Sequence, residues 1–219
     1  ILQHITFKII AVSSAVKNSL VSHGIKKDKI DVLVNGVMLE RFSKKYTLSK
    51  SQIGIREDRF VCICVARLIE QKGIDVLIDA VSKIEGAKDK LDLVLVGEGK
   101  DENKLREQVK DRGLEDAVHF LGIRNDIPDL LAMSDCFVLA SRYEGLGIVV
   151  IEAMAAGLPI VISDFDAGKD LVENEVNGLV VPREDSAALA LAINRLMQDY
   201  NFRKALAHSA KGQSLKFSI

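Results

Sequence analysis

Charge of one sign is not in excess in this chain of 219 residues. Lysine and arginine together number 30, aspartate and glutamate number 31, and the formal net charge is −1. This balance excludes a whole-chain basic field of the kind that attracts nucleic acid or anionic lipid. A long hydrophobic run is also lacking, because Glu152 and Pro159 interrupt the longest apolar stretch, near residues 148–162. We therefore expect neither a transmembrane helix nor a signal peptide.

Cysteine and histidine are both scarce. Cys62, Cys64 and Cys136 lie in apolar, strand-like runs, where a cysteine ordinarily acts as a small buried hydrophobe. The histidines are scattered without the spacing of metal ligands, at His4, His23, His119 and His208. We expect no protein-bound metal.

What is present, from Phe60 onward, is an alternation of short β-branched runs with amphipathic stretches, which predicts βα units and a parallel sheet. The predicted strands lie near residues 60–66, 92–97, 118–121, 136–139, 159–162 and 178–181. The predicted helices lie at 74–84, 102–112, 127–133, 148–156, 186–198 and 201–211. The sequence therefore predicts an α/β fold, a Rossmann-like parallel sheet with helices on both faces.

The segment before Phe60 differs in kind. It reads as a strand at 7–12, a helix capped by Ser13 or Ser14 and ended by Gly24, a strand at 30–34 and an Asn35-Gly36 turn. We expect residues 1–38 to be the tail of a preceding domain and 39–58 a polar linker and the start of the next one. Residues 59–219 would then form the second domain, cut short at its end. The chain opens on Ile1, and we expect it to be a piece of a longer polypeptide.

The strongest motif is a pair of carboxylates, Glu144 and Glu152, separated by seven residues across a Gly-rich turn and a helix start. Gly145 and Gly147 let a ligand approach the backbone, and the free N–H groups of the helix start suit a diphosphate. Glu152 lies on a helix that must be largely buried, so its carboxylate needs a partner. Ribose hydroxyls would serve, and so would a structural ion pair with a nearby Lys or Arg.

A second motif places Arg67 and Lys72 on the loop after the first strand of this domain. Together they could neutralise a diphosphate and stabilise it as a leaving group, although two solvated loop cations would look the same. Gly97-Glu98-Gly99 lacks the third glycine of a dinucleotide fingerprint and indicates a tight turn. Neither a phosphate-binding P-loop nor a serine-hydrolase nucleophile elbow occurs.

The motifs in series resemble the family-4 retaining glycosyltransferases of the GT-B fold, from about Ile9 to the C-terminus. Each segment is common alone, and their order carries the resemblance. In chain order they are Ile9-Ile10-Ala11-Val12-Ser13, Val34-Asn35-Gly36-Val37, Arg67 with Lys72-Gly73, Val96-Gly97-Glu98-Gly99, Phe120-Leu121-Gly122, Ser134-Asp135, and residues 141–147, 152–159 and 177–181. The chain would comprise the C-terminal donor-binding domain and the tail of the N-terminal, acceptor-side domain.

The resemblance implies roles for individual residues. Arg67 and Lys72 would bind the donor diphosphate, and Glu152 would take the ribose hydroxyls. Glu144 would contact the transferred sugar, and with Arg67 and Lys72 it would form the catalytic set. The donor-binding residues would be Ala66, Arg67, Lys72, Gly97, Gly122, Ile123, Arg124, Glu144, Gly145, Leu146, Gly147, Ile148 and Glu152.

The implied activity is transfer of a sugar from a nucleotide-diphosphate donor to a glycan, glycolipid or other acceptor. It would retain anomeric configuration and need neither metal nor cofactor, and this chain alone could bind donor without turning over. We expect a cytoplasmic protein, peripheral on the membrane face if the acceptor-side domain contacts it. The alternatives are a non-catalytic nucleotide-binding module, a nucleotide-sugar epimerase and an oxidoreductase on a similar sheet.

Two departures from the family pattern stand out. Ala66 occupies a position where the family commonly has glycine, a change that a negative φ would allow. After the fifth strand the family often has a Gly-Gly pair and then a glutamate, where this chain has Asp166-Ala167-Gly168-Lys169-Asp170. This loop is expected to face the sugar, so the identity of the sugar stays open.

Overall fold

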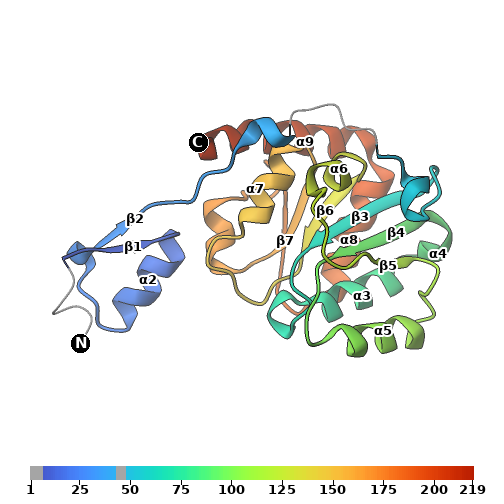
Figure 1. The fold of residues 1–219 in the computed structure, drawn as a ribbon, viewed down its shortest axis with the longest axis horizontal. Helices are drawn as coiled ribbons and strands as arrows, with labels where there is room; N and C mark the ends of the chain where they lie inside the picture. Colours follow the sequence, from blue (N-terminus) through green and yellow to red (C-terminus); the bar gives the residue numbers. More distant parts are fainter. Residues whose placement is uncertain (1–6, 43–47) are drawn as a thin grey trace.

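The computed structural model describes residues 7–42 and 48–219. His4 and the middle of the predicted linker, residues 43–47, lie outside the described residues. The described chain forms a small N-terminal unit beside a larger α/β unit (Figure 1).

The N-terminal unit is the predicted strand, helix and strand. β1 (Ile9–Ala11) pairs in parallel with β2 (Ile30–Val32), and α2 (Ser14–Ser22) connects them. The hydroxyl of Ser13 accepts a hydrogen bond from the backbone N–H of Val16 at 3.1 Å, so Ser13 is the helix cap. A short 3-10 helix, η1 (Lys27–Lys29), precedes β2.

The predicted turn at Asn35-Gly36 is wrong. This segment runs without a turn from β2 toward the larger unit, and Gly36 has no positive φ. A Cβ on Gly36 would lie 2.1 Å from Cγ2 of Ile219, so a small residue is needed where the C-terminal segment packs. The backbone N–H of Val37 donates to the carbonyl of Phe217 at 2.8 Å. A contact with the far end of the chain, rather than local propensity, sets the conformation here.

The larger unit is built on a six-stranded parallel sheet in the order β5-β4-β3-β6-β7-β8. The strands are β3 (Phe60–Val65), β4 (Leu91–Val96), β5 (Val118–Phe120), β6 (Cys136–Leu139), β7 (Ile160–Ser163) and β8 (Leu179–Val181). Every strand predicted for this domain is present, with ends shifted by about one residue. β3 pairs with β4 on one side and β6 on the other, so the chain reverses its direction of winding between β3 and β6.

Helices cover both faces of this sheet, as predicted. Figure 1 shows α3 and α5 below the strands and α6, α7 and α9 above them, and α8 packs beside α3. The helices are α3 (Ile74–Ser82), α4 (Ala87–Lys90), α5 (Glu102–Asp111), α6 (Ile127–Ala132), α7 (Ile148–Ala155), α8 (Ser186–Gln198) and α9 (Tyr200–Ser214). The four-residue α4 was not predicted, nor were η2 (Leu39–Phe42) and η3 (Lys50–Ile53) in the expected linker.

The core of the larger unit fills both faces of its sheet and recruits residues from before β3. Val37, Phe42 and Ile55 are buried in the same apolar cluster as the strands. The cysteines are buried and free, which confirms their predicted role as small hydrophobes. Sγ of Cys62 on β3 lies 3.0 Å from Sγ of Cys136 on β6, and burial raises the pKa of the Cys64 thiol to about 12.

A buried ion pair lies at the amino end of the sheet. Asp92, on β4, has no exposed surface, and its Oδ1 accepts a hydrogen bond from Nη1 of Arg59 at 2.8 Å. Nε2 of His119 lies 2.7 Å from the same oxygen. None of these contacts is visible in the sequence, because they join residues 27 and 33 positions apart that follow no local pattern.

Candidate functional site

The loops that follow β3 and β6 meet at the carboxyl edge of the sheet, where the winding reverses. Gly73 has a φ of 60°, and a Cβ there would lie 2.0 Å from the carbonyl oxygen of Ala140, so the close approach requires glycine. The backbone N–H of Arg142 donates to the carbonyl of Gln71 at 2.8 Å, and Nε2 of Gln71 donates to the carbonyl of Tyr143 at 2.9 Å. The two loops therefore form one connected surface at the switch point, where open α/β sheets bind ligands.

Lys72 and Glu144, predicted as separate ligand contacts, are joined in an ion pair on this surface. Nζ of Lys72 lies 2.5 Å from Oε1 of Glu144, and their side chains are only 14% and 8% exposed. The hydroxyl of Ser141, a residue that sequence analysis gave no role, donates to the same carboxylate oxygen at 2.7 Å. Lys72 is therefore not a solvated loop cation, and the charge of Glu144 is largely neutralised.

Arg67 is the exposed cation of this surface. Its guanidinium makes no hydrogen bond or ion pair with any other residue of 7–42 or 48–219, and only its backbone carbonyl is bonded, to the N–H of Ile69. Ala66 before it has no positive φ, so alanine fits where the resembled family commonly has glycine. A guanidinium with free donors, on the same loop as the largely buried ammonium of Lys72, suits an anionic ligand.

Helix α7 begins at the same edge. Gly147 precedes it with a φ of 87°, and this left-handed conformation turns the chain from the loop after β6 into the helix. The N–H of Val150 donates to the carbonyl of Gly147, and the N–H groups before it in the first turn have no acceptor within the helix, as an anion site needs. Leu146 is buried and Ile148 is 40% exposed, so Leu146 can offer a ligand only its backbone.

Glu152 lies in the second turn of α7, half-buried. Its carboxylate has no hydrogen bond or ion pair with the residues that the structure describes, so no structural partner is evident there. Burial raises the pKa of Glu152, and the charge of Arg41, on η2, opposes that rise. A half-buried carboxylate with open acceptor positions is the group that the sequence analysis assigns to ribose hydroxyls.

The loops after β4 and β5 carry the other predicted donor residues. Gly97 packs against the β3 loop, since a Cβ there would lie 2.1 Å from the carbonyl oxygen of Ala66, and its N–H donates to the carbonyl of Gly122 at 2.8 Å. Arg124 donates from Nε and Nη2 to the carboxylate of Asp126 at 2.8 and 2.5 Å. Its guanidinium is thus partly engaged, whereas Ile123 is 67% exposed.

The loop after β7, which departs from the family pattern, contacts the N-terminal unit. Its residues form a 3-10 helix, η5 (Asp166–Asp170). The carboxylate of Asp170 accepts a hydrogen bond from the backbone N–H of Ser14 at 2.8 Å, at the start of α2. An acidic group is favourable at a helix N-terminus, so Asp170 helps to hold the two units together.

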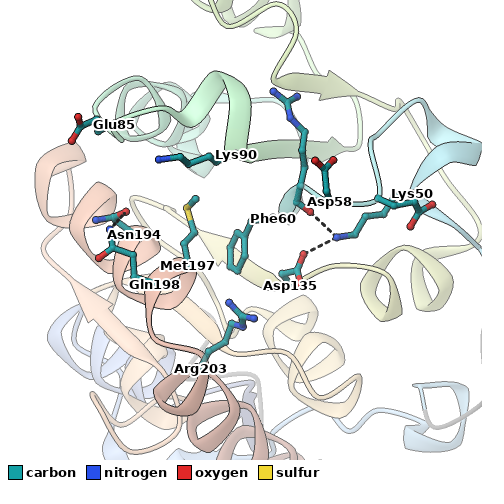
Figure 2. A pocket seen from close by; sticks show the side chains of 12 residues that line it. Lys50, Asp58, Phe60, Glu85, Lys90, Asp135, Asn194, Met197, Gln198 and Arg203 are labelled. Atoms are coloured by element: carbon teal, nitrogen blue, oxygen red, sulfur yellow. Dashed lines mark hydrogen bonds and ion pairs between the residues drawn. The ribbon is translucent and has the colours of Figure 1, made fainter.

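A separate cavity of about 550 Å³ opens at the opposite, amino end of the strands. Figure 2 shows Lys50, Phe60, Asp135 and Arg203 around it. Lys50 donates to Asp135 at 3.0 Å, and the Arg203 guanidinium lies 5.1 Å from the centre of the Phe60 ring. Because none of the predicted donor residues lines this cavity, we place the candidate site at the carboxyl edge.

Within 7–42 and 48–219, no three His, Cys, Asp or Glu side chains gather in a way that could hold a metal ion. No helix in the same part of the chain combines the length and apolarity needed to cross a membrane.

Comparison with known proteins gives consistent matches. The family described as "Glycosyl transferases group 1" matches residues 46–213. An uncharacterised glycosyltransferase of Methanocaldococcus jannaschii is 33% identical over 93% of this chain and 54% of its own length. An Escherichia coli UDP-Gal:alpha-D-GlcNAc-diphosphoundecaprenol alpha-1,3-galactosyltransferase is 34% identical over 78% of this chain and 46% of its own length. The chain spans about half the length of these curated relatives.

Solved structures agree on the fold. Anabaena Alr3699/HepE, in complex with UDP and glucose, superposes with a TM-score of 0.91 at 28% identity, over 99% of this chain and 60% of its own. WaaG, a glycosyltransferase of lipopolysaccharide biosynthesis, gives a TM-score of 0.85 at 23% identity, over 94% of this chain and 58% of its own. The predicted α/β fold of the GT-B type is thereby confirmed.

Proposed function

The chain belongs to the glycosyl transferases of group 1, and we propose that it is the donor-binding half of an enzyme that transfers a sugar from a nucleotide-diphosphate donor. The observation that carries this proposal is the cation pair at the switch point. The Arg67 guanidinium is free for a ligand, and Lys72, on the same loop, is oriented by Glu144. Two cations and a helix start together suit a diphosphate and would stabilise it as it leaves.

We further propose the family-4 type, with retention of configuration and without metal. In this scheme Glu152 takes the ribose hydroxyls, and the loop around Gly122 and Ile123 holds the base mainly through backbone groups. Glu144 orients Lys72, and through it the phosphate next to the transferred sugar. The Lys72–Glu144 contact supports this role for Glu144, because a carboxylate 2.5 Å from an ammonium limits where that ammonium can lie.

The relatives suggest the partners. HepE was solved with UDP and with UDP-glucose, so a uridine nucleotide is the first donor to test. Relatives from E. coli and Campylobacter jejuni are named for diphospho-undecaprenol acceptors, which supports a lipid-linked or glycan acceptor. A hexosyl donor, a cytoplasmic location and peripheral membrane association stay expectations.

Arg67→Ala is expected to weaken nucleoside diphosphate binding about 10- to 100-fold, because a hydrogen bond to a charged group contributes about 1.5–3 kcal/mol. Binding of the matching nucleoside, which lacks phosphates, should change less than about twofold. Calorimetric titration of both ligands measures the difference. Arg56→Ala removes an exposed arginine at the other end of the sheet and is the control. Equal losses for both ligands would remove Arg67 from the phosphate site. They would favour a different function, such as that of a non-catalytic nucleotide-binding module.

Glu152→Gln is expected to stabilise the chain at neutral pH while weakening nucleotide binding about tenfold through loss of a charged hydrogen-bond acceptor. The folded chain raises the pKa of Glu152 above its ordinary 4.5, so it binds this proton more tightly than the unfolded chain does. Wild-type stability therefore falls as pH rises from 4.5 through the raised value, and the glutamine variant lacks this fall.

Thermal melts between pH 4 and 8, together with titrations at pH 7, measure both effects of Glu152→Gln. Glu115→Gln, at an exposed position away from the site, is the control. A glutamine variant that is less stable at neutral pH would show that the carboxylate has a stabilising partner, and unchanged nucleotide affinity would remove Glu152 from the ribose site.

A further inference from the structure

The guanidinium of Arg142, on the loop after β6, is completely engaged. An arginine has five N–H donors; here the four on Nη1 and Nη2 are in hydrogen bonds, and Nε is in ion-pair contact. Nε lies 2.6 Å from Oε1 of Glu184, and Nη2 donates to Oε2 of Glu184 at 3.0 Å and to Oδ2 of Asp75 at 2.8 Å. Nη1 donates to Oδ1 of Asp75 at 3.0 Å and to the carbonyl of Glu70. Because all three guanidinium nitrogens are held by these acceptors, Arg142 is not available as a phosphate ligand in this arrangement.

These contacts join three parts of the carboxyl edge. Asp75 lies in the first turn of α3, Glu70 in the loop after β3, and Glu184 in the loop after β8. The Arg142 backbone N–H also donates to the Gln71 carbonyl at 2.8 Å, one residue before Lys72. Because Arg142 lies two residues before Glu144, the same side chain braces the loops that supply both members of the ion pair.

The energetics favour a fixed arrangement. The Arg142 side chain is only 23% exposed, and its hydrogen bonds to Asp75 raise its pKa. Burial raises the pKa of Asp75, but the bonds from Arg142 outweigh it and leave a lowered value. Glu184 has a φ of 61°, a left-handed conformation that is unusual for a residue other than glycine. Its carboxylate contacts Arg142 from this position. A lysine could not span both carboxylates, since its donors radiate from a single nitrogen.

We propose that Arg142 is a positioning residue of the donor site: shared between Asp75 and Glu184, it holds the Glu144 loop against the Lys72 loop and so sets the ion pair at the diphosphate. This inference rests on the proposed function. It predicts a loss confined to the phosphate part of the ligand, because the predicted base and ribose contacts belong to other segments, around Gly122 and at Glu152.

The test is calorimetric titration of the chain with UDP, GDP and ADP, each beside its own nucleoside. For the nucleoside diphosphate that the wild-type chain binds, Arg142→Gln is expected to lower affinity about tenfold, as a small displacement of binding groups does. The matching nucleoside should lose less than about twofold, and Arg142→Lys should resemble Arg142→Gln rather than the wild type. Arg112→Gln removes an arginine that pairs with Asp79, one turn further along α3, and should bind like the wild type.

Unchanged diphosphate affinity in a folded Arg142→Gln variant overturns the inference, as do equal losses for diphosphate and nucleoside, which would indicate general unfolding. If Arg142→Gln does not fold, Glu184→Gln replaces it. Glu184 is 55% exposed, and its substitution removes one of the two carboxylates that hold Arg142. Its diphosphate affinity should then fall about threefold without loss of nucleoside binding, and no change would count against the proposal. A wild-type chain that binds none of the three diphosphates overturns the proposed function itself, a failure recognisable before any variant is made.

Discussion

Replacing Lys72 with methionine is expected to lower the affinity of the chain for a nucleoside diphosphate about 100-fold, or about 2.7 kcal/mol. The ammonium lies 2.5 Å from the carboxylate of Glu144, which is 8% exposed. Without Lys72 a diphosphate would lose a charge-assisted hydrogen bond and would also meet an unneutralised carboxylate. Calorimetric titration measures the change.

A second variant separates binding from folding. Lys72→Met leaves Glu144 buried with only the Ser141 hydroxyl for a partner, and breaking a buried pair costs about 3–5 kcal/mol of stability. The double variant Lys72→Met/Glu144→Gln removes both charges and should recover most of that stability without recovering diphosphate affinity. If the double variant binds like the wild type, the loss in the single variant came from the fold and Lys72 has no phosphate role.

Asp92→Ala is expected to destabilise the chain by about 3–5 kcal/mol, the range for removing one partner of a buried ion pair. The guanidinium of Arg59, a residue only 8% exposed, would lose its carboxylate partner, and His119 would lose the same contact. Much of the stability of a domain this size would be lost, since folded domains are stable by about 5–15 kcal/mol.

Urea unfolding measures the effect of Asp92→Ala. Asp58→Ala removes the partner of Arg56 in an exposed pair nearby and should leave the midpoint unchanged. A loss below about 1 kcal/mol for Asp92→Ala would mean that the ion pair contributes no more than an exposed one does.

The strands and long helices could be predicted because their signals are local. The alternation of apolar runs with amphipathic stretches located β3 to β8. Gly113 and Gly157, both with a positive φ, follow the ends of α5 and α7, where a glycine commonly stops a helix. The one-turn α4 and η2 were not predicted, because segments this short show no helical periodicity. The prediction of a turn at Asn35-Gly36 was wrong for the opposite reason. The local signal for a turn is strong, but packing against Ile219, at the other end of the chain, sets the conformation.

The candidate site was predictable in its residues more than in its contacts. The sequence placed Lys72 on the loop after the first strand and Glu144 at a Gly-rich turn before a helix. The ion pair between them joins positions 72 residues apart, and no spacing in the sequence indicates it. Arg142 was passed over for the same reason, since its importance lies in Asp75 and Glu184, which come from other loops. Loop glycines are visible to sequence reasoning, whereas partners brought together by topology are not.

We propose that the carboxyl edge of the sheet binds the diphosphate of a nucleotide sugar. The measurement that tests it most directly is calorimetric titration of the wild-type chain with UDP, GDP and ADP in the presence of a metal chelator, with NAD as the control. We expect selective binding of one nucleoside diphosphate under these conditions and no binding of NAD. A chain that binds none of the three diphosphates, whether or not it binds NAD, would contradict this function.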